Sequence, residues 1–186
     1  MPLSESVARR EVHHRVIDMR TYARDDGLYD VEARLVDRKP FDYKRPSCPE
    51  PVPAGSPLHD LWIRVTLDET YVVRAIESSS DVTPWGVCKA AGSPLQGLVG
   101  QQVARGWSNR VKELLRGAAG CTHLMEMLVT LGTPALQGIR GLRRDQVNEP
   151  GHDRLPAKLD SCYAYGRGRD VVRMLWPDHY RPGPSS

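Results

Sequence analysis

The chain lacks any long apolar run. No stretch of its 186 residues approaches the roughly 20 apolar residues that a membrane-spanning helix needs. The N-terminus, MPLSESVARREVHHR, also lacks the apolar centre of a secretion signal. We therefore expect a cytoplasmic protein with no membrane partner.

An excess of one charge is missing too, as are the common nucleotide-binding motifs. The chain has 26 basic and 23 acidic residues, and a net charge of +3 is too even to indicate a nucleic-acid partner. It contains no GxxxxGKS or GxxxxGKT, GxGxxG, GxSxG or HExxH pattern. We therefore expect no nucleotide cofactor, and a small-molecule substrate is the predicted partner. The sequence leaves a homodimer open.

Closely spaced cysteine pairs are absent. The four cysteines, Cys48, Cys88, Cys121 and Cys162, include no CxxC pair. In a reducing compartment they are thiols or metal ligands before they are disulfides. Cys48 lies in a proline-rich segment and receives no role in the predicted site.

What the first half of the chain does contain is the pattern of two β-hairpins. Residues 12–37 hold two extended runs around Asp26 and Gly27, and the second run alternates apolar with charged side chains. Residues 39–57 are so rich in proline that they predict a connecting arm.

The second predicted hairpin opens residues 58–138. In HDLWIRVTL the apolar side chains alternate, and a turn at Asp68 and Glu69 leads to a second extended run, TYVVRAIESS. The apolar residues predicted to share one face are Leu61, Ile63, Val65 and Leu67.

After Pro84 the apolar period changes to three and four residues. This pattern predicts three helices, broken at Gly106 and at residues 117–120. Residues 139–157 are polar and predict a loop, whereas LDSCYAYG and RDVVRMLWP, within residues 159–176, predict one or two closing strands. Residues 181–186 predict a frayed tail.

Strands followed by helices predict an α+β fold. We expect a single domain spanning residues 1–186, with an antiparallel sheet made from two hairpins plus C-terminal strands. About three helices should pack on one face of this sheet.

Four blocks in this order resemble a known bacterial family. They are YARDDGLYDVEARLVDRKPFDY, SPLHDLWIRVTLD, GCTHLMEML followed by ALQ, and LDSCYAY. Together they resemble the signature blocks of domain of unknown function 2889 (DUF2889), from Val12 to Tyr165. Leu61 stands where we expect methionine, which is a conservative difference. The resemblance implies membership and no mechanism.

A second, weaker resemblance concerns architecture. A cysteine after a hairpin (Cys88), a helix containing LVGQQV, and a later helix that opens with Cys121 and His123 resemble NifU- and IscU-type iron–sulfur scaffold proteins and their SufE-like relatives. In those proteins the corresponding cysteine and cysteine–histidine pair converge on one metal. Here CTH replaces an adjacent histidine and cysteine, which weakens the transfer of ligands more than that of the fold.

Cys121 and His123 are the first candidates for catalysis. If a helix begins near Cys121, its unpaired N–H groups and positive dipole end lower the thiol pKa. A thiolate can bind a metal or attack an electrophile. Glu126, three residues after His123, can form a proton-transfer pair with it. The alternatives are a small buried cysteine and an ordinary solvated histidine–glutamate pair.

His59 is a further catalytic candidate. It shares a strand face with apolar residues, so it is either a catalyst or a hydrogen-bonded core histidine. Asp37 ends the second strand, either in a surface ion pair with Lys39 or as a carboxylate that faces the arm. His13 and His14 point to opposite faces of a strand, so only one of them can face a pocket.

A metal site is an alternative use of the thiols. Cys88 follows the second hairpin at the crossover to the helices, and Cys162 lies on an alternating stretch that could border the sheet. By ligand type, three thiols and one imidazole suit zinc or iron. The predicted metal ligands are Cys88, Cys121, His123 and Cys162.

Two functions follow from these residues. The first is a small metabolic enzyme without an organic cofactor, which catalyses a lyase, isomerase or cyclase step on a small carbonyl compound or aromatic acid. Its predicted catalytic residues are Cys121, His123, Glu126 and His59. The second is an iron–sulfur or zinc carrier of NifU-like architecture. We favour the enzyme because Trp85 and Trp107 lie near the candidate residues and indicate an enclosed apolar pocket.

Overall fold

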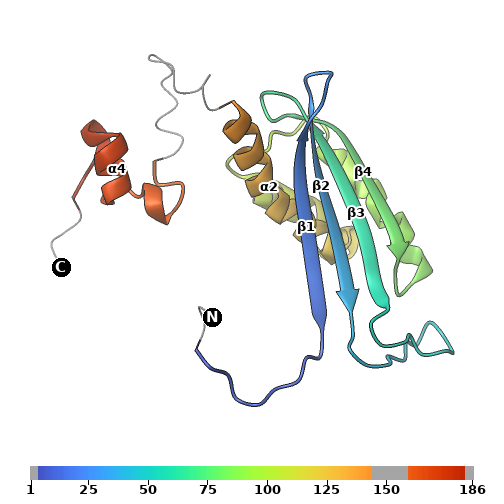
Figure 1. Cartoon of the computed structure of the whole chain (residues 1–186). Coiled ribbons are helices and arrows are strands. Elements are labelled where there is room, and N and C mark those ends of the chain that lie inside the picture. The colour runs from blue at the N-terminus through green and yellow to red at the C-terminus, as the bar shows by residue number, and fades with distance from the viewer. Residues whose placement is uncertain (1–3, 144–158, 183–186) are drawn as a thin grey trace. The chain divides into compact units, whose positions relative to one another are not determined.

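The computed structural model describes residues 4–143 and 159–182. The chain forms two compact units, Met1–Gly141 and Leu142–Ser186, where the sequence predicts a single domain. The first unit contains the sheet and the helices that cover it (Figure 1). The described residues of the second unit form short helical segments. Each unit is described by itself.

Four antiparallel strands form a meander in the order β1–β2–β3–β4. They span His14–Ala23 (β1), Tyr29–Arg38 (β2), Pro57–Leu67 (β3) and Val73–Val82 (β4). Both predicted hairpins are therefore present. In the first turn Gly27 has a φ of +82°, a backbone conformation that glycine adopts without steric cost. The Asp26 carboxylate accepts the backbone N–H of Leu28 and so stabilises the same turn.

The proline-rich arm connects β2 to β3. Within the arm, Tyr43 and Val52 form an isolated β-bridge, and the backbone N–H of Gly55 donates to Lys39 O at 2.8 Å. Two side-chain bonds fasten the arm to the segment after β4: Arg45 Nη1 donates to Thr83 O at 3.3 Å, and Ser47 Oγ donates to Pro84 O at 2.6 Å. The arm is thus held at one end of the sheet.

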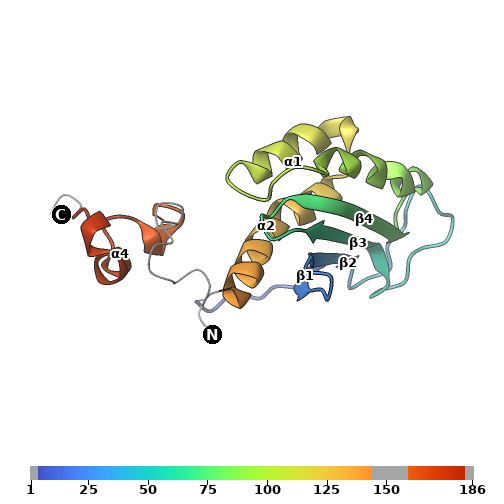
Figure 2. The same ribbon diagram turned by 90° about the horizontal axis from the view of Figure 1, so that it is seen from above.

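The helices of the first unit lie on one face of the sheet (Figures 1 and 2). They are the 3-10 helix η1 (Gly86–Leu98), α1 (Trp107–Leu115), the short 3-10 helix η2 (Gly117–Ala119) and α2 (Thr122–Leu142). The breaks fall at Gly106 and at residues 117–120, as the sequence predicts. α2 continues through Ile139, which is fully buried, so the prediction of a loop from residue 139 is wrong for residues 139–142. Residues 144–158 lie outside the described part of the chain.

The core lies between the sheet and these helices. Apolar side chains from one face of β2 and β3 pack against α1 and α2, and each large one among them stabilises the fold by about 1.5–3 kcal/mol. Trp107 Nε1 donates to Leu128 O at 2.7 Å and ties α1 to α2. The core residues of the sheet include Val31, Ala33, Leu35, Leu61, Ile63, Val65 and Leu67. This arrangement confirms the predicted α+β fold.

In the second unit, the predicted closing strands are wrong. Residues 159–176 instead form η4 (Tyr163–Tyr165) and α4 (Asp170–Leu175), followed by η5 (Pro177–His179). Local bonds explain the difference, because the Asp160 carboxylate accepts both the backbone N–H and the Nε–H of Arg167. Such side-chain bonds close a turn and compete with strand pairing.

Candidate functional site

The site begins with a row of polar side chains across three strands. Arg15 in β1 is the register partner of Asp37 in β2, and Asp37 is the partner of His59 in β3. Directly opposed residues point to the same face of a sheet, here the face that the helices cover. Arg15 donates to both Asp37 oxygens at 2.7 Å, and His59 Nδ1 lies 3.0 Å from Oδ2.

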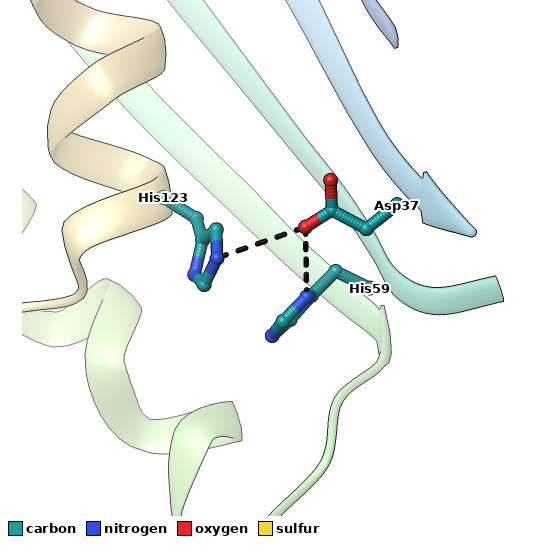
Figure 3. Close-up of side chains that lie close together, drawn as sticks. All are labelled: Asp37, His59 and His123. Carbon is teal, nitrogen blue, oxygen red and sulfur yellow. Dashed lines mark hydrogen bonds and ion pairs between the residues drawn. The ribbon is translucent and has the colours of Figure 1, made fainter. Parts of the chain in front are cut away.

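Asp37 is the centre of the cluster. Its side chain is only 2% exposed. His13 Nε2 lies 3.2 Å from Oδ1, and His123 Nε2 lies 3.7 Å from Oδ2 (Figure 3). One buried carboxylate therefore faces a guanidinium and three imidazoles.

His123 and Cys121 come from the start of α2, on the opposite side of the cluster from the strands. Cys121 is the residue before the helix, and its carbonyl accepts the N–H of Met125 at 2.9 Å. Its sulfur lies 3.7 Å from His123 Nδ1. The His123 ring packs against the His59 ring with centroids 4.0 Å apart and a tilt of 37° between the ring planes. The two ring nitrogens of His123 face Cys121 and Asp37. A thiol, an imidazole and a carboxylate therefore form a continuous line of contacts.

The helix start alters the acidity of Cys121. Burial acts to raise the pKa of this thiol, but the hydrogen bond with His123 and the backbone N–H groups of Leu124 and His123 outweigh it. The pKa of Cys121 is therefore below its ordinary value of 9.0. This is the behaviour expected of a sulfur at a helix N-terminus beside an imidazole.

The charges around Asp37 alter two further groups. Burial acts to raise the pKa of Asp37, but the hydrogen bonds and charge of Arg15, helped by His59 and His13, lower it overall. Burial lowers the pKa of His59, and the attraction of Asp37 only partly offsets this. Asp37 is therefore ionised and His59 neutral at pH 7.

A cavity of about 570 Å³ opens beside these groups. His59, Cys88, Cys121 and His123 contribute to its wall. The rest is mostly apolar and comes from the end of the sheet, η1 and the segment before α2. Its apolar residues include Leu61, Pro84, Trp85, Val87, Ala91 and Pro94. The thiol and the imidazoles therefore face a space that suits an apolar small molecule.

The structure brings three of the four predicted catalytic residues together. Cys121, His123 and His59 lie together, whereas the Glu126 carboxylate pairs with Arg15 instead of His123. The carboxylate found beside His123 is Asp37. Glu126 accepts from Arg15 Nη1, whereas Asp37 accepts from Nε and Nη2 of the same guanidinium.

Three of the four predicted metal ligands, Cys88, Cys121 and His123, line one cavity. Cys162 belongs to the second unit and is exposed. Among residues 4–143 and 159–182, one group of three or more potential ligands has all its donor atoms within 4.8 Å of one another. It consists of Asp37, His59 and His123.

These three side chains could hold a divalent cation, since two imidazoles and a carboxylate form a common ligand set for zinc and iron. Any such ion would share Asp37 with Arg15, which already donates to both oxygens. The positive guanidinium beside the carboxylate opposes cation binding there.

Sequence reasoning gave no catalytic role to Arg15, Asp37 or His13. A signal was present, because Asp37 continues the inward alternation of Ala33 and Leu35 by one more step. Its buried position in the centre of the cluster could not be predicted, because it depends on the register between β2 and β3, which the arm separates in the sequence.

The fold and the site define an α+β protein with a thiol–imidazole–carboxylate cluster beside an apolar cavity. Residues 13–137 match DUF2889, described as a protein of unknown function, and the chain belongs to this family. The match covers the whole sheet and the cluster, and it ends before LDSCYAY. No curated protein matches the chain, and no solved structure does. The comparisons therefore give no support to the NifU-like resemblance. In the described residues, no helix is long and apolar enough to cross a membrane.

Proposed function

We propose that this protein is an enzyme of small carbonyl compounds, of the lyase, isomerase or cyclase class, with Cys121 as nucleophile and His123 as its proton-transfer partner. The observation that carries the proposal is the line of contacts from Cys121 Sγ to His123 Nδ1 and from His123 Nε2 to Asp37 Oδ2, each 3.7 Å. It supplies a nucleophile, a proton carrier and an orienting carboxylate.

The roles follow from the positions of the atoms. Cys121 as a thiolate would form a bond to a carbon of a double bond conjugated to the substrate carbonyl, while the π electrons move to the carbonyl oxygen, which takes the proton from His123 Nδ1. After rotation about the carbon–carbon bond that has become single, return of this proton to His123 and loss of the thiolate would re-form the double bond in its other geometry, so that the substrate is isomerised and the site is regenerated. Asp37 would orient the imidazole and stabilise its protonated form. His59 would complete the wall beside the reacting carbon.

Turnover tests this function. The parent protein is incubated with a panel of small unsaturated aldehydes and keto acids, aromatic ones included, and products are followed by proton NMR. Cys121→Ser and His123→Asn should each lower the rate by about a hundredfold or more, the usual contribution of a nucleophile or proton-transfer group. Cys88→Ser, a matched thiol of the same cavity, should stay within a few-fold of the parent. A Cys121→Ser protein with the parent's rate contradicts the proposal.

A zinc or iron carrier is the second candidate. It is favoured by the ligand atoms of Asp37, His59 and His123, all within 4.8 Å of one another. Metal analysis after purification without a metal-affinity tag, followed by titration with cobalt, tests it. If the protein is a carrier, we expect about one bound metal ion per chain, and we expect the d–d absorption bands of bound cobalt to disappear in the His59→Gln variant. A metal-free protein that keeps full turnover excludes this candidate.

A further inference from the structure

A second hollow, of about 270 Å³, lies beside the cavity. The two share His59, Pro84 and Trp85 as lining residues. The remaining wall comes mainly from the proline-rich arm, including Arg45 and Ser47. A molecule bound against Cys121 therefore has a neighbouring compartment in which a second functional group can lie.

Arg45 is the charged residue of this hollow, and its hydrogen-bonding capacity is largely unused. Its Nε is buried and has no partner, the one such side-chain nitrogen or oxygen in the described part of the chain. The one hydrogen bond of its side chain there is the 3.3 Å contact from Nη1 to Thr83 O. None of the ion pairs found in these residues includes Arg45. The terminal Nη2 also has no hydrogen bond in the described residues, so a carboxylate in the hollow that accepts from it gains a charged hydrogen bond without breaking one.

The chemistry of the hollow points to a carboxylate. A guanidinium presents two parallel N–H groups that match the two oxygens of a carboxylate. No second Lys or Arg side chain lines the hollow, so the clustered positive charge of a typical phosphate site is missing from its wall. The arm bonds of Arg45 and Ser47 to the segment after β4 hold the guanidinium in place.

We propose that Arg45 binds the carboxylate of the substrate, which is a small carboxylic acid with an apolar, aromatic-sized body and a carbonyl group. The carboxylate lies in the arm hollow, and the carbonyl lies in the neighbouring cavity against Cys121. This inference rests on the proposed function for the reacting end, whereas the recognition of the acid end rests on Arg45.

Ligand-observed fluorine NMR tests the recognition directly. The full chain is titrated with para-fluorobenzoate and with its neutral analogue, para-fluorobenzamide. The benzoate should bind about tenfold more tightly, the effect of a hydrogen bond to a charged group. Arg45→Met should remove this preference, and Arg45→Lys should restore only part of it, because an ammonium lacks the planar fork.

Lys44→Met is the matched control, since it removes an exposed positive charge from the adjacent position of the same arm. It should leave benzoate binding within twofold of the parent. Equal affinity for benzoate and benzamide, no binding of either probe, or equal losses in Lys44→Met and Arg45→Met would each overturn the inference. Displacement of benzoate by an equal concentration of inorganic phosphate would show a general anion site and overturn it as well. Circular dichroism of each variant checks that it is folded.

Cys121→Ser separates this inference from the proposed function. The variant should lose turnover and still bind benzoate, because Arg45 remains intact. If Cys121→Ser keeps the parent's turnover while Arg45→Met loses benzoate binding, the acid site stands and the thiol mechanism fails. If benzoate binding does not depend on Arg45 while turnover depends on Cys121, the reverse holds.

Discussion

Burial and acidity affect the reactivity of Cys121 in opposite directions. Cys162 is exposed, whereas Cys121 is half-buried but has a lowered pKa. The thiolate is the nucleophilic form, so acidity should dominate at neutral pH. We expect iodoacetamide to label Cys121 with a rate–pH midpoint below 9.0, and His123→Asn to move that midpoint upward. Peptide mass spectrometry measures both sites in one sample, with Cys162 as the internal control. A Cys121 midpoint at or above 9.0 contradicts the assigned helix-start effect.

Asp37 should make the free energy of unfolding depend on pH in the acid range. Its folded-state pKa is lowered, so its contribution is present above the unfolded value of 3.8 and is lost as pH falls below it. The pKa of His59 is also lowered, so the unfolded chain takes up a proton first as pH falls below 6.5, and stability declines there too. Asp37→Asn should lower the free energy of unfolding at pH 7 by about 2–4 kcal/mol, because it leaves Arg15 with only Glu126.

Urea unfolding from pH 7.5 to pH 3 measures this dependence. Asp37→Asn should remove the loss near pH 3.8 and keep the loss below pH 6.5, whereas His59→Gln should do the reverse. Asp18→Asn is the control, since Asp18 is an exposed partner of Arg20 and should cost less than about 1 kcal/mol. Equal effects of the two aspartate variants would show that Asp37 has no special role.

At the scale of elements, the turn between β3 and β4 depends on one carboxylate. Asp68 accepts the backbone N–H groups of Thr70 and Val72 and pairs with Arg74. Burial acts to raise its pKa, but these bonds and the Thr70 hydroxyl lower the pKa of Asp68 to about 2. The contribution is therefore full above pH 3.8 and is lost as pH falls toward about 2.

Asp68→Asn keeps the shape of the turn and removes the charge. We expect it to lower the free energy of unfolding at pH 7 by about 1–2 kcal/mol, after allowance for solvent screening. The difference from the parent should shrink as the pH approaches 2. Chemical unfolding at both pH values measures it, and Glu77→Gln, which removes an exposed carboxylate of β4, is the control. A pH-independent difference would contradict a charge effect.

Elements with a strong local pattern could be predicted from sequence. The alternation in β2 and β3 predicted the hairpins, and the three- and four-residue period after Pro84 predicted the helical layer. The structure confirms both predictions. The short second unit could not be predicted this way, because the alternation in LDSCYAY is overridden by the local bonds of Asp160. The Cys121–His123 pair could be predicted because the two residues are close in the sequence. The position of Asp37 beside His59 could not, because it depends on the register between β2 and β3, which the arm separates.

At the scale of the whole molecule, the cluster and its cavity are built entirely from residues of the first unit. Removal of residues 144–186 should therefore leave cooperative unfolding and the alkylation rate of Cys121 unchanged, because the remaining chain is long enough to bury a core. Thermal melting and labelling of the shortened chain measure this. A shortened chain that melts without cooperativity, or whose Cys121 reacts like an unfolded thiol, contradicts the assignment of the site to the first unit.

The arm leaves the sheet at Arg38 and re-enters it at Pro57, and these two residues are register partners. The intervening loop can therefore be exchanged for a longer or shorter one without shifting either strand. If Arg45 binds the acid as proposed, replacing this segment alone should change the acid preference, while Cys121 and His123 stay on an unaltered scaffold.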